Sequence, residues 1–239
     1  MAAYEDAVRK SIIIVVILVV VGVVWVRWTF PSISYRYRLS VAVEVDGKVH
    51  SGSTVIGVWF RFYPRPLSFV FNTFEERVSG QAALIDLGAR GVLVVALGGP
   101  DRCDVSAGDL FGRAYETAAA RHACVPGYPR SIANELHLSH TTGSVELTAD
   151  NMPLFIWFPD KSDPKTAQFV KPVDFTTTIG DLTRLSAARV EITQDPVVVD
   201  IDKKLPLYNR LPPPTGSDIL RLPDGRYLNW SMFIAPGSV

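Results

Sequence analysis

Two histidines three residues apart form the most metal-like motif in this chain of 239 residues. On a helix, His137 and His140 would lie on one face, where two imidazoles can share an ion. A zinc site needs at least a third protein ligand, and the sequence offers only His122 and Asp150 nearby. The Ser and Thr residues around the pair are typical of an exposed loop. We therefore predict no metal site and keep His137 and His140 only as candidate ligands.

Cys103 and Cys124 are the two cysteines of the chain and could form a disulfide. Such a bond closes a loop of about 20 residues and would contribute roughly 3 kcal/mol through lost chain entropy in the unfolded state. The two residues flank a predicted helix over 106–122, however. Residues 109–121 alone would span roughly 20 Å, whereas a disulfide allows only about 4.4–6.8 Å between Cα atoms. A disulfide and two free thiols both remain open.

The motifs of common hydrolases and nucleotide-binding enzymes are absent from the sequence. It contains no G-x-S-x-G, H-E-x-x-H, P-loop or G-x-G-x-x-G. Asp160, Asp163, Asp200 and Asp202 match no EF-hand spacing, so we interpret them as solvated turn carboxylates. A net charge of zero without a basic stripe argues against nucleic-acid binding. We predict no catalytic residue and no cofactor.

An unbroken apolar run extends from Ile12 to Val26 near the N-terminus. Continued to Phe30, it covers about 19 residues, close to the roughly 20 that a membrane-spanning helix needs. A buried core helix would need a polar face, and a cleaved signal peptide would need a small-residue cleavage site. Neither feature is present in the sequence. We therefore predict an uncleaved transmembrane anchor over residues 11–30.

Three residues at the end of this run suit the membrane–water interface, namely Trp25, Arg27 and Trp28. Indole rings favour the headgroup level, and an arginine can extend its charged head out of the apolar layer. Basic residues lie on both sides of the run, so their count does not set its orientation. A short basic tail before the run and a cysteine pair suited to an oxidising compartment favour a signal anchor. We predict a single-pass protein of the inner membrane, in contact with the lipid bilayer, whose C-terminal domain lies in the periplasm.

Beyond the anchor, the sequence predicts an α+β, β-rich domain that is mostly antiparallel and carries one or two helices. Residues 35–45 alternate strictly between apolar and polar, as in a half-buried strand. Asp46-Gly47 then favours a two-residue hairpin turn, which would pair Tyr37 with Ile56. Further strands are expected at 78–86, 92–97, 145–148, 154–158, 189–193 and 197–201, and helices at 106–122 and 174–179.

The sequence divides into a tail at 1–10, the anchor at 11–30, a β-rich extracytoplasmic domain at 31–210, and a Pro-rich linker with a C-terminal hairpin at 211–239. The proline run at 212–214 is a stiff spacer, and an isolated apolar hairpin is marginally stable in water. The hairpin must therefore bury its face either on a protein partner or on its own domain, and both alternatives stay open. The partner contact is predicted at Tyr227, Trp230, Met232 and Phe233, whose types are frequent at interfaces.

The order of several short segments is also informative. Tyr35-Arg36-Tyr37-Arg38-Leu39 opens the hairpin, and Ser51-Gly52-Ser53-Thr54-Val55-Ile56 and residues 80–87 follow. A block from 153 to 206 then contains Asp163-Pro164, Val173-Asp174-Phe175, Val190-Glu191-Ile192-Thr193, Asp195-Pro196 and Lys204-Leu205-Pro206. Together these segments resemble a family of membrane-anchored proteins of alphaproteobacteria that has no assigned function. The resemblance covers roughly residues 31–210 and implies a shared fold and anchor, without a catalytic motif.

These features predict a membrane-anchored accessory or structural subunit that binds other membrane or periplasmic proteins. The competing prediction is a membrane-anchored, hydrolase-like periplasmic enzyme whose site is assembled from scattered residues. A large polar pocket with two or more His or carboxylate groups would favour the enzyme. A flat apolar surface, or an ordered tail without support from the domain, would favour the subunit.

Overall fold

The computed structural model describes residues 2–63, 74–99, 105–115, 131–211, 220–222, 224–228 and 230–235. The chain forms two units. The smaller unit comprises Met1–Ile33 and Phe60–Glu76, and the larger one comprises Ser34–Trp59 and Arg77–Val239.

The smaller unit consists of helix α1 (Ala2–Thr29) and the ends of three strands that continue into the larger unit. The side chains of α1 are described from Ile12 to Trp25, and each of its large apolar ones is at least 49% exposed. In the strand ends, Phe60, Phe62 and Phe74 form an aromatic cluster with ring centroids 6.2–6.4 Å apart.

The predicted membrane span falls within α1. Among the helices, as far as their residues are described, none is both long enough and apolar enough to cross a membrane. The structure therefore gives no support to the transmembrane helix predicted for residues 11–30, which stays a prediction.

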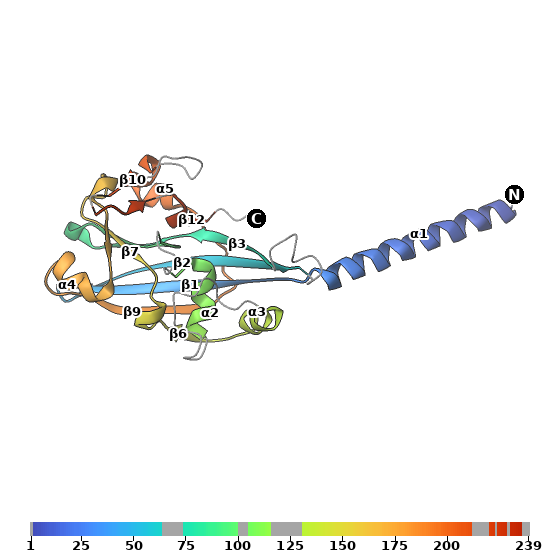
Figure 1. Cartoon of the computed structure of the whole chain (residues 1–239), viewed down its shortest axis with the longest axis horizontal. Coiled ribbons are helices and arrows are strands. Elements are labelled where there is room, and N and C mark those ends of the chain that lie inside the picture. Colours follow the sequence, from blue (N-terminus) through green and yellow to red (C-terminus); the bar gives the residue numbers. More distant parts are fainter. Residues whose placement is uncertain are drawn as a thin grey trace. The chain divides into compact units, whose positions relative to one another are not determined.

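A six-stranded sheet in the order β12-β3-β2-β1-β9-β6 forms the first layer (Figure 1). The hairpin predicted at Asp46-Gly47 is confirmed, because both turn residues have positive φ angles of 52° and 78°, as a type I′ turn requires. The alternating residues of β1 are buried on one face, where Tyr37 and Val43 are 0% exposed. The strands are β1 (Ser32–Val45), β2 (Lys48–Phe62), β3 (Phe74–Gln81), β6 (Ser144–Glu146), β9 (Thr183–Ile192) and β12 (Ile234–Ala235).

A second, antiparallel sheet has four strands in the order β4-β5-β7-β8. All four side chains of its central strand β5 are buried, as its continuous apolar sequence predicts. The single strand predicted over 78–86 is wrong, because β3 and β4 belong to different sheets. Gly80 has a φ of 142°, and the Ala82 N–H bonds Phe233 O at 2.8 Å, in register with the pairing of β3 and β12, before the chain enters β4. The strands are β4 (Ala83–Asp86), β5 (Val92–Val95), β7 (Phe155–Phe158) and β8 (Gln168–Val170).

The C-terminal elements pack against this second sheet. Phe233 and Leu228 are 0% exposed and share one core cluster with Val94 and Ile156. The C-terminal elements thus cover one face of the four-stranded sheet. These elements are α5 (Ile201–Lys204), η6 (Pro206–Arg210), β10 (Leu220–Arg221), β11 (Tyr227–Leu228) and η7 (Trp230–Met232), followed by β12.

Short helices complete the larger unit. Ser106 begins α2 (Ala107–Tyr115) as predicted, since its Oγ accepts a bond from the Asp109 N–H at 3.2 Å; the rest of the predicted helix lies outside the described residues. The strand predicted over 197–201 is wrong, because residues 193–200 join no sheet and α5 begins at Ile201. The remaining helices are α3 (Ile132–Ser139), α4 (Phe175–Thr178), η2 (Gly88–Arg90), η3 (Ala149–Asn151), η4 (Pro164–Thr166) and η5 (Pro172–Asp174).

Candidate functional site

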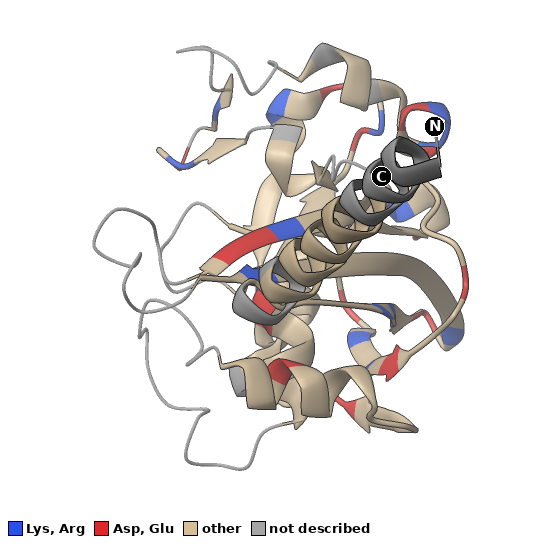
Figure 2. Ribbon diagram, turned by 90° about the vertical axis from the view of Figure 1, so that its right-hand side faces the viewer, with Lys and Arg blue, Asp and Glu red and all other residues tan. Residues whose placement is uncertain are grey.

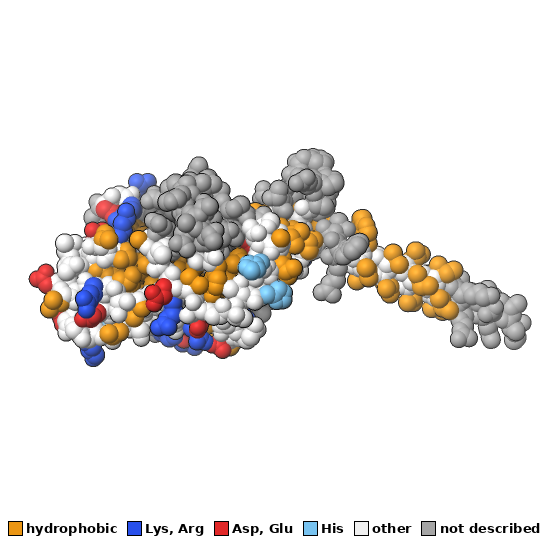
Figure 3. Space-filling view, turned by 90° about the horizontal axis from the view of Figure 1, so that it is seen from below, with side chains coloured by type: hydrophobic (Ala, Val, Ile, Leu, Met, Phe, Trp, Pro, Cys, Tyr) orange, Lys and Arg blue, Asp and Glu red, His pale blue; other side chains and the backbone are white. Residues whose placement is uncertain are grey.

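The two histidines lie at the end of α3, not in the exposed loop that we expected. Ser131 caps this helix by accepting a bond from the Asn134 N–H at 3.1 Å. His137 and His140 are both exposed, and histidine side chains are visible at the surface in Figure 3. In the described part of the chain, no group of three or more His, Cys, Asp or Glu residues could hold a metal ion. The pair therefore has no described third ligand.

Several predicted residues lie outside what the structure describes. Cys103 and Cys124 are outside the described residues, and so are the side chains of Arg27, Trp28 and Trp230. Trp25 is described and 64% exposed. The disulfide and most of the predicted interface residues therefore stay predictions.

Two of the predicted turn carboxylates are indeed turn residues, of which Asp160 is exposed and Asp163 half-buried. Asp160 accepts a bond from the Ser162 N–H at 2.8 Å, and Asp163 accepts one from the Lys165 N–H at 2.9 Å. Each carboxylate thus stabilises its own turn.

The partner contact predicted in the C-terminal tail requires a correction. Met232 is 3% exposed and Phe233 is 0% exposed, because both lie in the core of their own domain. Ile234 of β12 also pairs with Gln81 of β3. Of the two alternatives, the tail docks on its own domain, and these two side chains are not available at the surface. Tyr227 remains half-buried.

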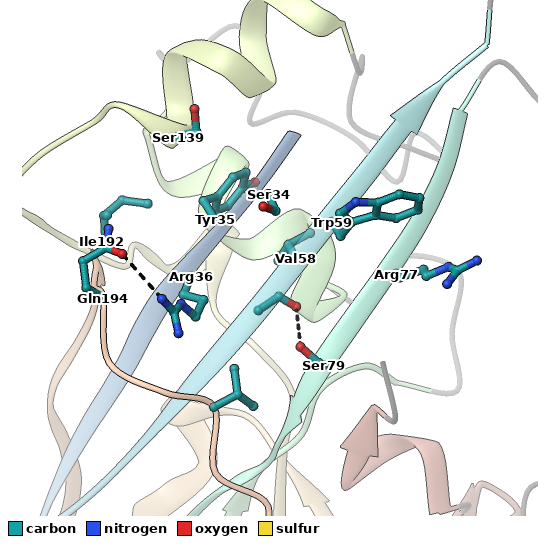
Figure 4. Close-up of a pocket in the computed structure, with 12 residues that line it drawn as sticks. Ser34, Tyr35, Arg36, Val58, Trp59, Arg77, Ser79, Ser139, Ile192 and Gln194 are labelled. Carbon is teal, nitrogen blue, oxygen red and sulfur yellow. Dashed lines mark hydrogen bonds between the residues drawn. The ribbon is translucent and has the colours of Figure 1, made fainter. Parts of the chain in front are cut away.

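A groove of about 660 Å³ lies in the larger unit. Its floor is the face of β1, β2 and β3 that points away from the buried side chains, and Figure 4 shows the residues that line it. Arg36 and Trp59 point into this face because they alternate with the buried residues Tyr37 and Val58. Arg77 and Ser79 of β3 extend the lining, and Ser139 of α3 forms part of its rim.

Residues 193–200, which we call the strap, cross this face after β9. At its start, the Thr193 N–H donates to Arg36 O at 2.9 Å. Midway, Val197 lies over Gly57, where an added methyl group would be 3.3 Å from Val197 Cγ2. At its end, Gln81 Nε2 donates to Asp200 Oδ1 at 2.8 Å, and Gln81 Oε1 accepts from the Asp200 N–H at 2.7 Å. The strap is therefore an extended segment fixed on the sheet at both ends.

The end of the strap carries a negative charge on the half-buried side chain of Asp200, which we had interpreted as a solvated turn carboxylate. The hydrogen bond from the Gln81 amide, followed by that from the Lys204 ammonium, holds the pKa of Asp200 below its usual value. Lys204 Nζ lies 2.9 Å from Asp200 Oδ2. Asp200 is therefore ionised at neutral pH and stabilises the junction of strap and α5.

Two arginines on the same face of β1 differ in their partners. Arg38 forms ion pairs with Glu191 at 3.4 Å and with Asp195 of the strap. Arg36 donates from Nη2 to the neutral Gln194 Oε1 at 3.5 Å (Figure 4), which is long for a hydrogen bond. Within the described residues, no carboxylate pairs with Arg36. The groove thus contains a half-buried guanidinium whose described side-chain partner is uncharged.

An aromatic side chain adds a second recognition element. The Arg77 guanidinium lies 5.0 Å from the centre of the Trp59 ring, within the range of a cation–π interaction. This stacking orients the indole along the groove. The Tyr35 hydroxyl, by contrast, donates to the fully buried Glu135 at 3.1 Å, so that carboxylate belongs to the interior.

Among the described residues that line the groove there is no His, Cys, Asp or Glu. The lining offers guanidinium and hydroxyl donors and an aromatic face, but no acid–base pair. Comparisons with protein-family models, with curated proteins and with solved structures found no match. The groove could not be predicted from the sequence, because it combines residues from β1, β2, β3, α3 and the strap that share no local motif.

Proposed function

We propose that this chain is a single-pass, membrane-anchored accessory subunit whose periplasmic domain binds a protein partner through the groove face of the six-stranded sheet. The observation that carries the proposal is the composition of the groove. Arginine and tryptophan are among the residue types most enriched at binding hot spots, and Arg36, Arg77 and Trp59 line it.

The exposed apolar helix supports the anchor in this proposal. Between Ile12 and Trp25, the large side chains are apolar and exposed (Figure 3). A helix that is apolar on all sides requires an apolar environment, either a protein core or a bilayer. A membrane location also fits the signal-anchor layout of the N-terminal tail.

Charge distribution argues against a nucleic-acid partner. Figure 2 shows basic and acidic residues interspersed over the described part of the domain. Without a continuous basic surface, neutralisation of a phosphate backbone would be weak. The enzyme alternative finds no support in the groove either, since the described lining lacks the His and carboxylate groups that it would need.

Purification of the tagged full-length chain from native membranes in a mild detergent tests this function. We expect a protein partner in a fixed ratio, and its loss when Trp59 and Arg36 are replaced together. A matched replacement of Arg184, an exposed arginine of β9 that pairs with Glu44 outside the groove, should retain the partner. A chain that purifies alone from native membranes contradicts the proposal.

The anchor and its orientation have separate tests. Alkaline carbonate should leave the full chain in the membrane pellet and release a variant that lacks residues 2–30. An alkaline phosphatase fusion after Val239 should be active, because the enzyme requires an oxidising compartment for its disulfides. Release of the full chain by carbonate contradicts the anchor, and activity only from a cytoplasmic reporter contradicts the orientation.

A further inference from the structure

The strap shows how the groove face binds an extended peptide. It uses an ion pair between Asp195 and Arg38 and an apolar contact of Val197 over Gly57. These two interactions are of the kinds by which a partner segment would be recognised on a sheet face. The strap occupies one side of this face, and the groove is the open space beside it (Figure 4).

The groove contains a second arginine on the same face, Arg36, but no described acidic side chain pairs with it. Arg36 lies two residues before Arg38 on the same face of β1, yet it contacts neutral Gln194 where Arg38 contacts Asp195 and Glu191. A carboxylate would bind a guanidinium through shorter, charge-assisted bonds that a neutral amide cannot match. Trp59 contributes an aromatic side chain to the same groove.

We propose that the groove binds an extended acidic segment of the partner protein, with a carboxylate on Arg36 and an apolar side chain against Trp59. This inference rests on the proposed function and identifies the chemistry of the partner. The incoming carboxylate displaces Gln194 from Arg36, which costs little because that bond is 3.5 Å long. A protein segment is favoured over a lipid headgroup because the same face already holds a peptide, the strap.

Binding of short labelled peptides to the full chain in a neutral detergent tests the proposal. The probes are a glutamate-rich peptide with one leucine and the same peptide with glutamine in place of glutamate. We expect the glutamate peptide to bind at least about tenfold more tightly. Arg36→Gln should weaken its binding by about tenfold or more, whereas Arg184→Gln should leave it unchanged. Equal binding of both peptides, or equal loss in both variants, overturns the proposal.

The variant Gln194→Glu tests the same arginine without replacing it. It places a carboxylate beside Arg36 within the chain itself, so it should weaken peptide binding by about tenfold without lowering the melting temperature. Arg36→Glu should reverse the preference, binding a lysine-rich peptide and rejecting the glutamate-rich one. If Gln194→Glu binds the glutamate peptide as tightly as the parent chain does, Arg36 is not the recognition site.

Two further outcomes separate this inference from its alternatives. Soluble short-chain phosphatidylglycerol should not displace the glutamate peptide. If the chain binds this lipid but does not bind the peptide, the groove is a site for anionic lipid and the proposal is overturned. A partner that co-purifies equally with the parent chain and with Gln194→Glu leaves the proposed function standing and contradicts the inference. Peptide binding by a chain that purifies without any partner supports the inference and contradicts the proposed function.

Discussion

The two sheets of the larger unit use their faces differently. In the four-stranded sheet, β5 is buried on both faces, and Val94 and Leu93 on its opposite sides are each 0% exposed. In the six-stranded sheet, only one face of β1 is buried, while the other carries Arg36, Arg38 and the contacts to the strap. Because a sheet covered on both sides has no surface left for a ligand, we place the proposed binding on the open face of the six-stranded sheet.

The difference also separates the apolar residues of the core from those that line the groove. Phe233 and Met232 of the tail cover one face of the four-stranded sheet and belong to its core. Trp59, in contrast, lies on the open face and lines a groove. Phe233 and Trp59 are both aromatic and both have apolar neighbours in the sequence. Their burial in the structure distinguishes them.

Truncation after Leu211 tests the structural side of this comparison with the largest expected effect. It removes Leu222, Leu228, Met232, Phe233 and Ile234, all buried in the cluster. Each such side chain contributes about 1.5–3 kcal/mol, so their sum is comparable to the entire stability of a domain, about 5–15 kcal/mol. We expect an unfolded or aggregated chain by circular dichroism and gel filtration. An unchanged melting temperature would mean that the tail is not part of the core.

Phe233→Ala and Trp59→Ala compare the two regions directly. The first leaves a cavity in a closed core and should lower the free energy of unfolding by about 3–5 kcal/mol. The second removes a partly exposed ring and its cation–π contact, which costs about 1 kcal/mol or less. Denaturant unfolding of both variants measures the difference. Equal losses would show that Trp59 is a core residue.

Gly57→Val tests whether the strap depends on close packing against the sheet. The valine methyl groups would collide with Val197 and with the Ser79 Oγ, which lies 2.6 Å from the first added carbon. Overpacking of this kind costs about 1–3 kcal/mol, and here it should act mainly on the strap. We expect faster hydrogen exchange in residues 193–200, while Val197→Ala, which adds no atoms, should change exchange less. Unaltered exchange in Gly57→Val would mean that the strap is not seated on Gly57.

Gln81→Ala is the most pH-dependent of these changes. Gln81 is 6% exposed and holds Asp200 through two hydrogen bonds, so its loss should cost about 1–3 kcal/mol at neutral pH.

The pH dependence of this cost has a definite sign. The pKa of Asp200 is lower in the folded state, so its contribution is complete above the unfolded pKa of about 3.9 and is lost as the pH falls through the folded pKa. The difference in unfolding free energy between the parent chain and Gln81→Ala should therefore shrink below about pH 4. A difference that is constant with pH would show that the Asp200 carboxylate does not carry the effect.

The sequence correctly predicted those parts of the fold that are specified by residues close together in the chain. The alternation in residues 35–45 and the Asp46-Gly47 turn specify the β1–β2 hairpin within one continuous segment. The apolar run at 92–97 likewise predicts the buried central strand β5. Both signals are independent of distant residues, which explains why they were sufficient.

The errors arose where distant contacts decide the structure. β3 pairs with β12 near the C-terminus before the chain enters β4 in the other sheet, and residues 78–86 carry no information about that distant strand. Residues 197–199 have the composition of a strand, yet they lie on the face of a sheet and not in its ladder. The groove was missed for the same reason, since Arg36, Trp59, Arg77 and Gln194 converge only after the sheet and the strap are in place.

Site-specific photo-crosslinking in intact membranes tests the central claim most directly. A photoreactive amino acid is placed in the full-length chain either at Trp59, in the groove, or at Tyr227, in the C-terminal elements that cover the four-stranded sheet. The account predicts a crosslink to a protein partner from position 59 and none from position 227. A crosslink from position 227 without one from position 59 would contradict it, and would assign recognition to the C-terminal elements.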